Sequence, residues 1–143
     1  MKPVKNREAA SSPNPTENLD LQILVVDDDP IFRTLMLSAA EEKHVSVTVC
    51  ASLREVEKLR RPGGFDIAVV DYYLDNLLET ETGTEISFVT PSTPTILVSN
   101  TNKGIDDNLV WPPSIRKFIH KKLGADEILE QAIVLCRKGN GRR

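Results

Sequence analysis

The sequence lacks the features that would place it in a membrane, in an oxidising compartment or on nucleic acid. No apolar run approaches the roughly 20 residues that span a bilayer, and the N-terminus lacks the apolar centre of a secretion signal. Only two cysteines, Cys50 and Cys136, occur in 143 residues, so we expect reduced thiols rather than a disulfide. The net charge of -3 lacks the basic excess that a phosphate backbone demands. We expect a cytoplasmic protein with no nucleic-acid or membrane partner.

The chain divides into three segments by composition. Residues 1–20 are rich in Ser, Pro, Asn and charge, which predicts a flexible leader. Residues 21–138 alternate short β-branched runs with stretches of helical periodicity, the pattern of βαβ units in a parallel sheet. Residues 139–143 form a short basic tail. The sequence therefore predicts one α/β domain, a doubly wound parallel sheet of five strands.

The apolar patterns place the individual elements. The expected strands are residues 22–26, 45–49, 66–70, 95–98 and 116–120, the second near the sheet edge. Helices are expected from Pro30, from Ser52 to near Pro62, and over 126–137, because cap residues precede apolar stripes there. In the first helix we expect five residues to face the sheet: Ile31, Phe32, Leu35, Met36 and Ala39. Residues 72–92 are acidic and poor in apolar side chains, so the third helix is expected to be short or irregular.

Charged residues stand at the ends of three expected strands. Asp27, Asp28 and Asp29 follow the first strand, Asp71 follows the third, and Lys121 follows the fifth. Ligands bind at the carboxyl ends of an open parallel sheet, so these side chains are expected to converge there. Crowded carboxylates repel one another unless they are exposed or neutralised by a divalent cation. The pattern predicts an acidic metal site beside one ammonium group.

The triple aspartate has two further interpretations. Asp29 followed by Pro30 is favoured as a helix N-cap over a metal ligand, because this pair is a standard helix start. Asp27 and Asp28 alone would also suit a solvated loop. With Ser99 after the fourth strand, the carboxylates and Lys121 instead match a site that handles a phosphoryl group with Mg²⁺.

Four motifs together resemble the receiver domain of two-component response regulators. They are V-V-D-D at 25–28, V-V-D at 69–71, V-S at 98–99 and F-I-H-K at 118–121. Their intervals are close to those usual in the family, and the resemblance covers nearly everything after the leader. It implies a flavodoxin-like sheet with strand order 2-1-3-4-5.

The resemblance also implies a role for each matching residue. Asp71 would accept a phosphoryl group, Ser99 would hydrogen-bond its oxygen, and Lys121 would pair with its charge. Phe118 would be an aromatic switch that turns inward on phosphorylation, although plain core packing explains a buried aromatic equally well. The Mg²⁺ ligands would be Asp27, Asp28, Asp71 and the backbone carbonyl of Tyr73.

The sequence departs from the family pattern at three places. Asp75 and the late Gly83 replace the usual Pro and early Gly after the phosphoacceptor, which predicts a remodelled third helix. Asn100 follows the hydroxyl residue where a small residue is usual, so its side chain would narrow access to Asp71. Lys122 stands where the family has a cis-proline, and because a cis bond to another residue costs about 3 kcal/mol, we expect a trans peptide and a shifted loop.

The leading hypothesis is a stand-alone receiver that takes a phosphoryl group on Asp71 from a sensor histidine kinase or a histidine phosphotransfer protein. It would transfer and hydrolyse the phosphoryl group itself, without being a conventional enzyme. It would signal by contacting a downstream protein or by forming a homodimer. The main alternative is a pseudo-receiver that binds partners without phosphorylation. A phosphatase using D-x-D at Asp27 and Asp29 ranks lower, because it needs a larger scaffold.

Three further features leave alternatives open. His120 is interpreted as a packed or hydrogen-bonded histidine rather than a phosphate carrier. Trp111 is either a partner contact or a lid on the fourth helix. The acidic stretch from Asp75 to Glu85 is most simply a solvated loop, and it would also attract a basic partner.

Overall fold

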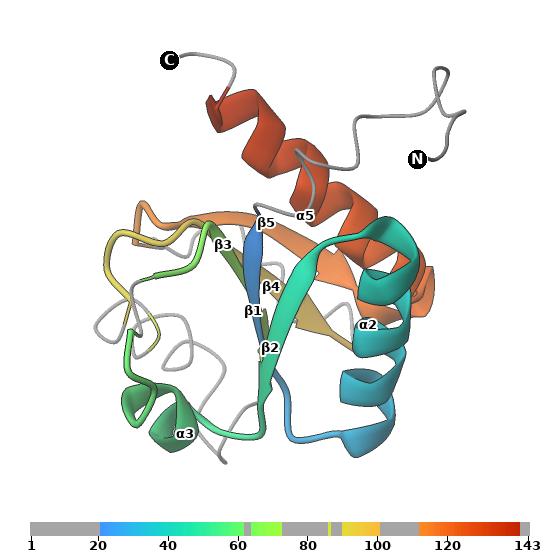
Figure 1. The fold of residues 1–143 in the computed structure, drawn as a ribbon, viewed down its shortest axis with the longest axis horizontal. Helices are drawn as coiled ribbons and strands as arrows, with labels where there is room; N and C mark the ends of the chain where they lie inside the picture. Colours follow the sequence, from blue (N-terminus) through green and yellow to red (C-terminus); the bar gives the residue numbers. More distant parts are fainter. Residues whose placement is uncertain (1–20, 62–63, 73–85, 87–89, 101–111, 141–143) are drawn as a thin grey trace, which may run out of the picture.

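The computed structural model describes residues 21–61, 64–72, 86, 90–100 and 112–140. Its centre is a five-stranded parallel sheet with strand order β2-β1-β3-β4-β5 (Figure 1). This confirms the fold class and the strand order expected from the sequence. The strands are β1 (Gln22–Val26), β2 (Ser46–Cys50), β3 (Ile67–Asp71), β4 (Thr95–Ser99) and β5 (Ile115–His120).

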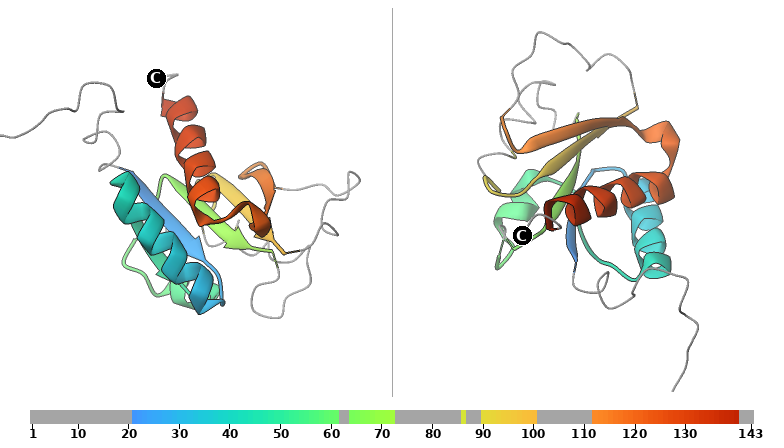
Figure 2. Two further views of the ribbon diagram at one scale, coloured as in Figure 1. Left: turned by 90° about the vertical axis from the view of Figure 1, so that its right-hand side faces the viewer. Right: turned by 90° about the horizontal axis from the view of Figure 1, so that it is seen from above.

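Two apolar layers cover the sheet, one on each face. On one face, α2 (Pro30–Lys43) and α5 (Ala125–Asn140) pack side by side (Figure 2), and on the other lies the short α3 (Leu53–Glu57). Ile23 and Val25 belong to the layer with α2 and α5, whereas Leu24 and Val26 belong to the layer with α3. Each central strand is therefore apolar at successive positions because both of its faces are buried.

Helix α2 begins as expected and faces the sheet differently. The side chain of Asp29 accepts a hydrogen bond of 2.9 Å from the backbone N of Ile31, which confirms Asp29 as the N-cap. Phe32, Met36 and Ala39 are buried, but Ile31 and Leu35 are 70% and 51% exposed. The expectation that these two face the sheet was wrong. Each directly precedes a buried residue, and successive residues point about 100° apart around a helix, so both point away from the sheet.

Helix α3 is shorter than expected. Ser52 caps it by accepting from the backbone N of Glu55, and the Glu55 side chain accepts from the backbone N of Ala51. The helix ends at Glu57 instead of near Pro62. Lys58 and Leu59 donate to carbonyls three residues earlier, so the last turn tightens and α-helical geometry stops there.

The remaining boundaries differ from expectation by one to three residues. Asp71 and Ser99 are the last residues of β3 and β4 instead of following them, and β5 starts at Ile115. A one-turn 3-10 helix, η2 (Lys121–Leu123), connects β5 to α5. An ion pair of 3.3 Å between Lys43 and Glu130 joins α2 to α5.

Several expectations concern parts of the chain outside the described residues. They are the leader, residues 141–143 of the basic tail, most of the third-helix region with Tyr73, Asp75 and Gly83, and Trp111. The first two residues expected in the tail, Gly139 and Asn140, instead end α5. Within the described part, no helix combines the length and the apolar character that crossing a bilayer requires.

Candidate functional site

The carboxyl ends of β1 and β3 bring the predicted aspartates together. These strands pair in parallel with Val26 opposite Val70, so Asp27 and Asp71 occupy neighbouring positions one residue further on. Asp27 is fully buried, Asp71 is almost buried, and Asp28 is exposed. One carboxylate oxygen from each of the three residues lies within 4.8 Å of the others. This is the convergence that the sequence predicted.

Backbone contacts fix the loop that follows β1. Asp27 Oδ1 accepts from the backbone N of Asp29 at 2.9 Å, and the backbone N of Asp27 donates to the Cys50 carbonyl at 3.0 Å. Arg33 Nη1 donates to the Asp27 carbonyl at 2.8 Å. Asp29 itself is occupied in capping α2. The loop therefore holds Asp27 in place and leaves its second oxygen, Oδ2, directed at other groups.

Lys121 brings a positive charge into the cluster. Its Nζ lies 2.6 Å from Asp27 Oδ2 and 3.8 Å from Asp71 Oδ2, and its side chain is only 8% exposed. The ammonium group also lies 4.8 Å from the centre of the Phe32 ring. One ammonium group faces three carboxylates, so the cluster keeps an excess of negative charge.

The backbone after β5 directs Lys121 into the site. Lys121 is the first residue of η2, whose N-cap is His120. The Nδ1 atom of His120 accepts a hydrogen bond of 3.0 Å from the backbone N of Lys122. This confirms that His120 is hydrogen-bonded. No cis peptide bond occurs among the described residues, which confirms the expected trans bond before Lys122.

Ser99 and Phe118 lie on the neighbouring strands. Ser99 is fully buried at the end of β4, next to β3, and pairs in register with His120 of β5. Phe118 is half-buried and packs edge-on against Tyr72, with ring centroids 4.8 Å apart and an interplanar angle of 80°. Asn100 is exposed just beyond Ser99. The structure thus places the Phe118 ring against the residue that follows Asp71.

Sequence reasoning missed two residues beside the site. Arg33 contacts the Asp27 backbone, and its position one turn into the helix after Asp29 would have indicated this. Tyr72 is fully buried and donates its backbone N to the Val98 carbonyl at 2.8 Å. A large aromatic directly after a central strand was the signal available for Tyr72.

The donor set fits a divalent cation. Three carboxylates, two of them buried, offer hard oxygen atoms to one point at the edge of the sheet. Mg²⁺ prefers such oxygens, keeps several waters and commonly also binds a phosphate oxygen. The negative excess that remains beside Lys121 would favour a bound cation.

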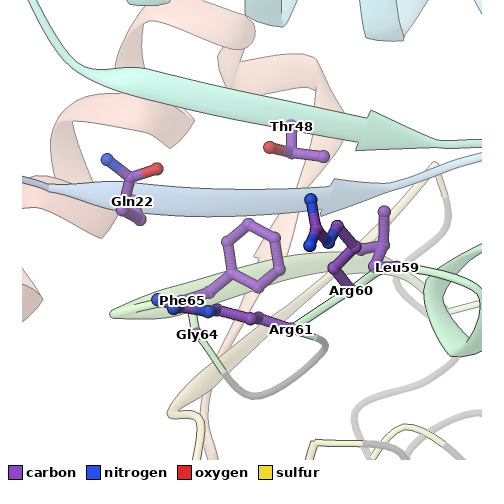
Figure 3. A pocket seen from close by; sticks show the side chains of 7 residues that line it. All are labelled: Gln22, Thr48, Leu59, Arg60, Arg61, Gly64 and Phe65. Carbon is purple, nitrogen blue, oxygen red and sulfur yellow. The ribbon is translucent and has the colours of Figure 1, made fainter.

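A hollow of about 840 Å³ lies away from this cluster (Figure 3). It is on the α3 side, near the start of β1 and the chain that leads into β3. Its lining is Gln22, Thr48, Leu59, Arg60, Arg61, Gly64 and Phe65. It contains no carboxylate and none of the predicted site residues, so the acidic cluster remains the candidate site.

The parallel sheet has the flavodoxin-like strand order, and its carboxyl edge carries an acidic pocket beside a lysine. Residues 23–133 match the family model described as the response regulator receiver domain, and the chain belongs to this family.

Solved structures support the same fold. A CheY-like receiver domain protein from Methanospirillum hungatei matches with a TM-score of 0.67 at 19% identity, covering 86% of this chain and 98% of that chain. A response regulator from Thermotoga maritima in complex with Mg²⁺ and BeF matches with a TM-score of 0.66 at 23% identity. The match covers 80% of this chain and 98% of that chain. No curated protein sequence matches the chain.

Proposed function

We propose that this chain is a single-domain response regulator in a phosphorelay, and that Asp71 accepts a phosphoryl group from a phosphohistidine. The observation that carries this proposal is the cluster of Asp27, Asp28 and Asp71 with Lys121 against it. Family membership supports a histidine kinase or a histidine phosphotransfer protein as the donor. The setting would be the cytoplasm.

The transfer exchanges one bond to phosphorus for another. An oxygen of the Asp71 carboxylate attacks phosphorus, and the P–N bond to the donor imidazole breaks as the P–O bond forms. The departing nitrogen keeps the electron pair and takes up a proton. Hydrolysis of the resulting acyl phosphate by water would reset the protein.

The other site residues would stabilise charge during this exchange. Lys121 Nζ, 3.8 Å from Asp71 Oδ2, would pair with a phosphoryl oxygen, and the Ser99 hydroxyl would hydrogen-bond another. Asp27, Asp28, Asp71 and the Tyr73 carbonyl would hold Mg²⁺. When bound, Mg²⁺ would neutralise the charge that the phosphoryl group brings close to the carboxylates.

The partner would dock beside the acidic pocket. Ile31 and Leu35, one turn apart near the start of α2, are exposed by 70% and 51%, and Leu123 in η2 is 48% exposed. Both elements directly adjoin residues of the cluster. Apolar side chains exposed next to a phosphoacceptor suit contact with a protein donor. Output would pass through Phe118 to a downstream protein or to a homodimer.

A pseudo-receiver is the second candidate function. Phe118 already packs against the buried Tyr72 ring, and Lys121 lies closer to Asp27 than to Asp71. A switch residue held inward in this way would favour one fixed state. In that case the protein would bind its target without phosphorylation.

One experiment separates the two candidates. The purified protein is incubated with Mg²⁺ and a small phosphodonor, and intact mass is measured for wild type, Asp71→Asn and the control Glu57→Gln, an exposed residue of α3. We expect one added phosphoryl group in wild type and Glu57→Gln and none in Asp71→Asn. A known receiver domain, incubated with the same phosphodonor, serves as the positive control. If this control gains mass and our protein binds Mg²⁺ but gains no mass in any variant, the result would favour the pseudo-receiver.

A further inference from the structure

We propose that His120 is a positioning residue that holds Lys121 in the acidic cluster by capping η2. The inference rests on the proposed function, because it concerns how the charge beside Asp71 is placed. It does not assign His120 any contact with the phosphoryl group. Its starting point is the hydrogen bond between His120 Nδ1 and the backbone N of Lys122.

The η2 turn has little intrinsic stability. It spans three residues, and the Gly124 backbone N closes it by donating to the Lys121 carbonyl at 3.0 Å. A helix this short has no cooperative propagation, and the N–H groups of its first residues have no partner within the helix. An acceptor for the Lys122 N–H therefore helps to keep the turn formed, together with the bond from Gly124.

His120 is well placed to supply that acceptor. Its backbone is fixed in β5 by pairing with β4, where it lies in register with Ser99. Its Nδ1 accepts only when it carries no proton, so the hydrogen bond requires the neutral tautomer with the proton on Nε2. The side chain thus connects the end of the sheet to the turn that carries Lys121.

The direction of the Lys121 side chain depends on this turn. Nζ reaches Asp27 Oδ2 at 2.6 Å from the first residue of η2, although a lysine side chain has four rotatable bonds. If η2 opens, the Lys121 backbone rotates and the ammonium group spends less time among the carboxylates. Two effects follow: the phosphoryl transfer loses a stabilising charge, and the carboxylates lose a cation that competes with Mg²⁺.

Two substitutions separate the acceptor from the bulk of the side chain. In asparagine, Oδ1 is attached to Cγ as Nδ1 is in histidine, so His120→Asn keeps an acceptor at the same position. In leucine, a methyl group takes that position, so His120→Leu keeps the branching and removes the acceptor. Asparagine is also a favourable N-cap residue.

The readouts are the Mg²⁺ dissociation constant by calorimetry and the phosphorylation rate with a small phosphodonor at saturating Mg²⁺. From the typical strength of one cap, we expect His120→Leu to slow phosphorylation about fivefold and to tighten Mg²⁺ binding about threefold. His120→Asn should retain most of the wild-type values for both. Opposite changes in the two readouts would not arise from general loss of folding.

A double substitution and a spectrum complete the test. In a Lys121→Gln background, His120→Leu should change neither quantity further, because the residue it positions is gone. The imidazole ¹⁵N shifts of His120 in the wild type should show the tautomer protonated at Nε2. The proposal would be overturned if His120→Leu changed the rate and the Mg²⁺ affinity equally in the wild-type and Lys121→Gln backgrounds. It would also be overturned if His120→Asn changed both quantities as much as His120→Leu.

The two proposals fail in different ways. If the wild type takes no phosphoryl group, the proposed function fails, and the Mg²⁺ affinities and the tautomer still test the role of His120. If the wild type is phosphorylated and His120→Leu matches it in both rate and Mg²⁺ affinity, only the role of His120 is overturned.

Discussion

The two ends of the sheet carry their charges in opposite ways. At the carboxyl end, Asp27, Asp71 and Lys121 lie almost buried, and Lys121 is within ion-pairing distance of both aspartates. On the α3 side near the amino end, Arg60 and Arg61 line an open hollow and are exposed. Exposed charges keep their hydration and cost little, whereas buried charges cost stability.

This difference separates an end of the sheet that bears buried charge from one that does not. Two carboxylates buried side by side destabilise the fold, so their presence calls for a chemical role. The exposed arginines require no such explanation. If the carboxyl end alone carries the chemistry, substitutions there should alter phosphorylation and Mg²⁺ binding, and substitutions at the amino end should not.

The largest effect is expected from Lys121→Gln. Removing the charge that faces the phosphoryl group should slow phosphorylation of Asp71 about 10²-fold, as removal of one preorganised stabilising group typically does. Mg²⁺ binding should tighten about tenfold, because a competing cation leaves the carboxylates. Phosphorylation is followed by intact mass, with Lys117→Gln on the exposed side of β5 as the control. If Lys117→Gln slows phosphorylation equally, the slower rate of Lys121→Gln would result from the change in the protein's net charge and not from the position of Lys121.

A second effect concerns stability in Mg²⁺. At a concentration 100 times the dissociation constant, a ligand that binds only the native state raises the free energy of unfolding by about 2.7 kcal/mol. Wild type should show this gain in urea unfolding, and Asp27→Asn should lose most of it. If Mg²⁺ raised the free energy of unfolding equally in wild type and Asp27→Asn, the cation would bind at a site that does not include Asp27.

A third, smaller effect is a substitution in the cluster that raises the free energy of unfolding. Without Mg²⁺, Asp71→Asn should unfold with a free energy about 1 kcal/mol higher than wild type, because one of three mutually repelling carboxylates becomes neutral. The measurement is urea unfolding in a chelating buffer. A destabilised Asp71→Asn would show that the repulsion is already relieved, and the comparison between the two ends of the sheet would weaken.

The thiols provide a further contrast with the charged site. Burial and, secondarily, the charge of Asp66 raise the pKa of Cys136 to about 11, and burial raises the pKa of Cys50. Raised thiol pKa values contribute stability that is present below about 9 and is lost as pH rises toward 11. Thiol labelling of the native protein at pH 8 should be slow, and unfolding should make both cysteines reactive. Fast native labelling would contradict their burial.

The smallest effect is expected at the other end of the sheet. The double substitution Arg60→Gln and Arg61→Gln should change the unfolding free energy by no more than about 0.5 kcal/mol, as exposed positions usually do. Phosphorylation and Mg²⁺ affinity should match the wild type. A loss of either would show that the hollow near the amino end communicates with the acidic cluster.

The sequence predicted the strands and the converging aspartates well because both depend on local patterns. Uninterrupted apolar runs mark strands buried on two faces, and charged residues at their ends must meet at one edge of a parallel sheet. The Asp29 cap of α2 was likewise predictable from the residue pair that starts the helix.

What the sequence could not predict depends on tertiary packing. Whether Leu35 or its neighbour Met36 is buried depends on where the sheet touches α2. The apolar stripe of this helix is wide enough to include both residues, so the pattern alone does not show which one faces the sheet. The early end of α3 follows from a tightened last turn. The bond from Lys122 to His120 required knowing that η2 forms, and no pattern in the sequence indicates a one-turn helix at that position.

The position of the phosphoryl group in the chain can be determined chemically. The protein is phosphorylated with a small phosphodonor, with and without Mg²⁺, and then reduced with borohydride, which converts an aspartyl phosphate to homoserine. Peptide mapping by mass spectrometry then finds the converted residue. We expect homoserine at position 71 only in the sample with Mg²⁺. Conversion at another residue, or at position 71 regardless of Mg²⁺, would contradict the account.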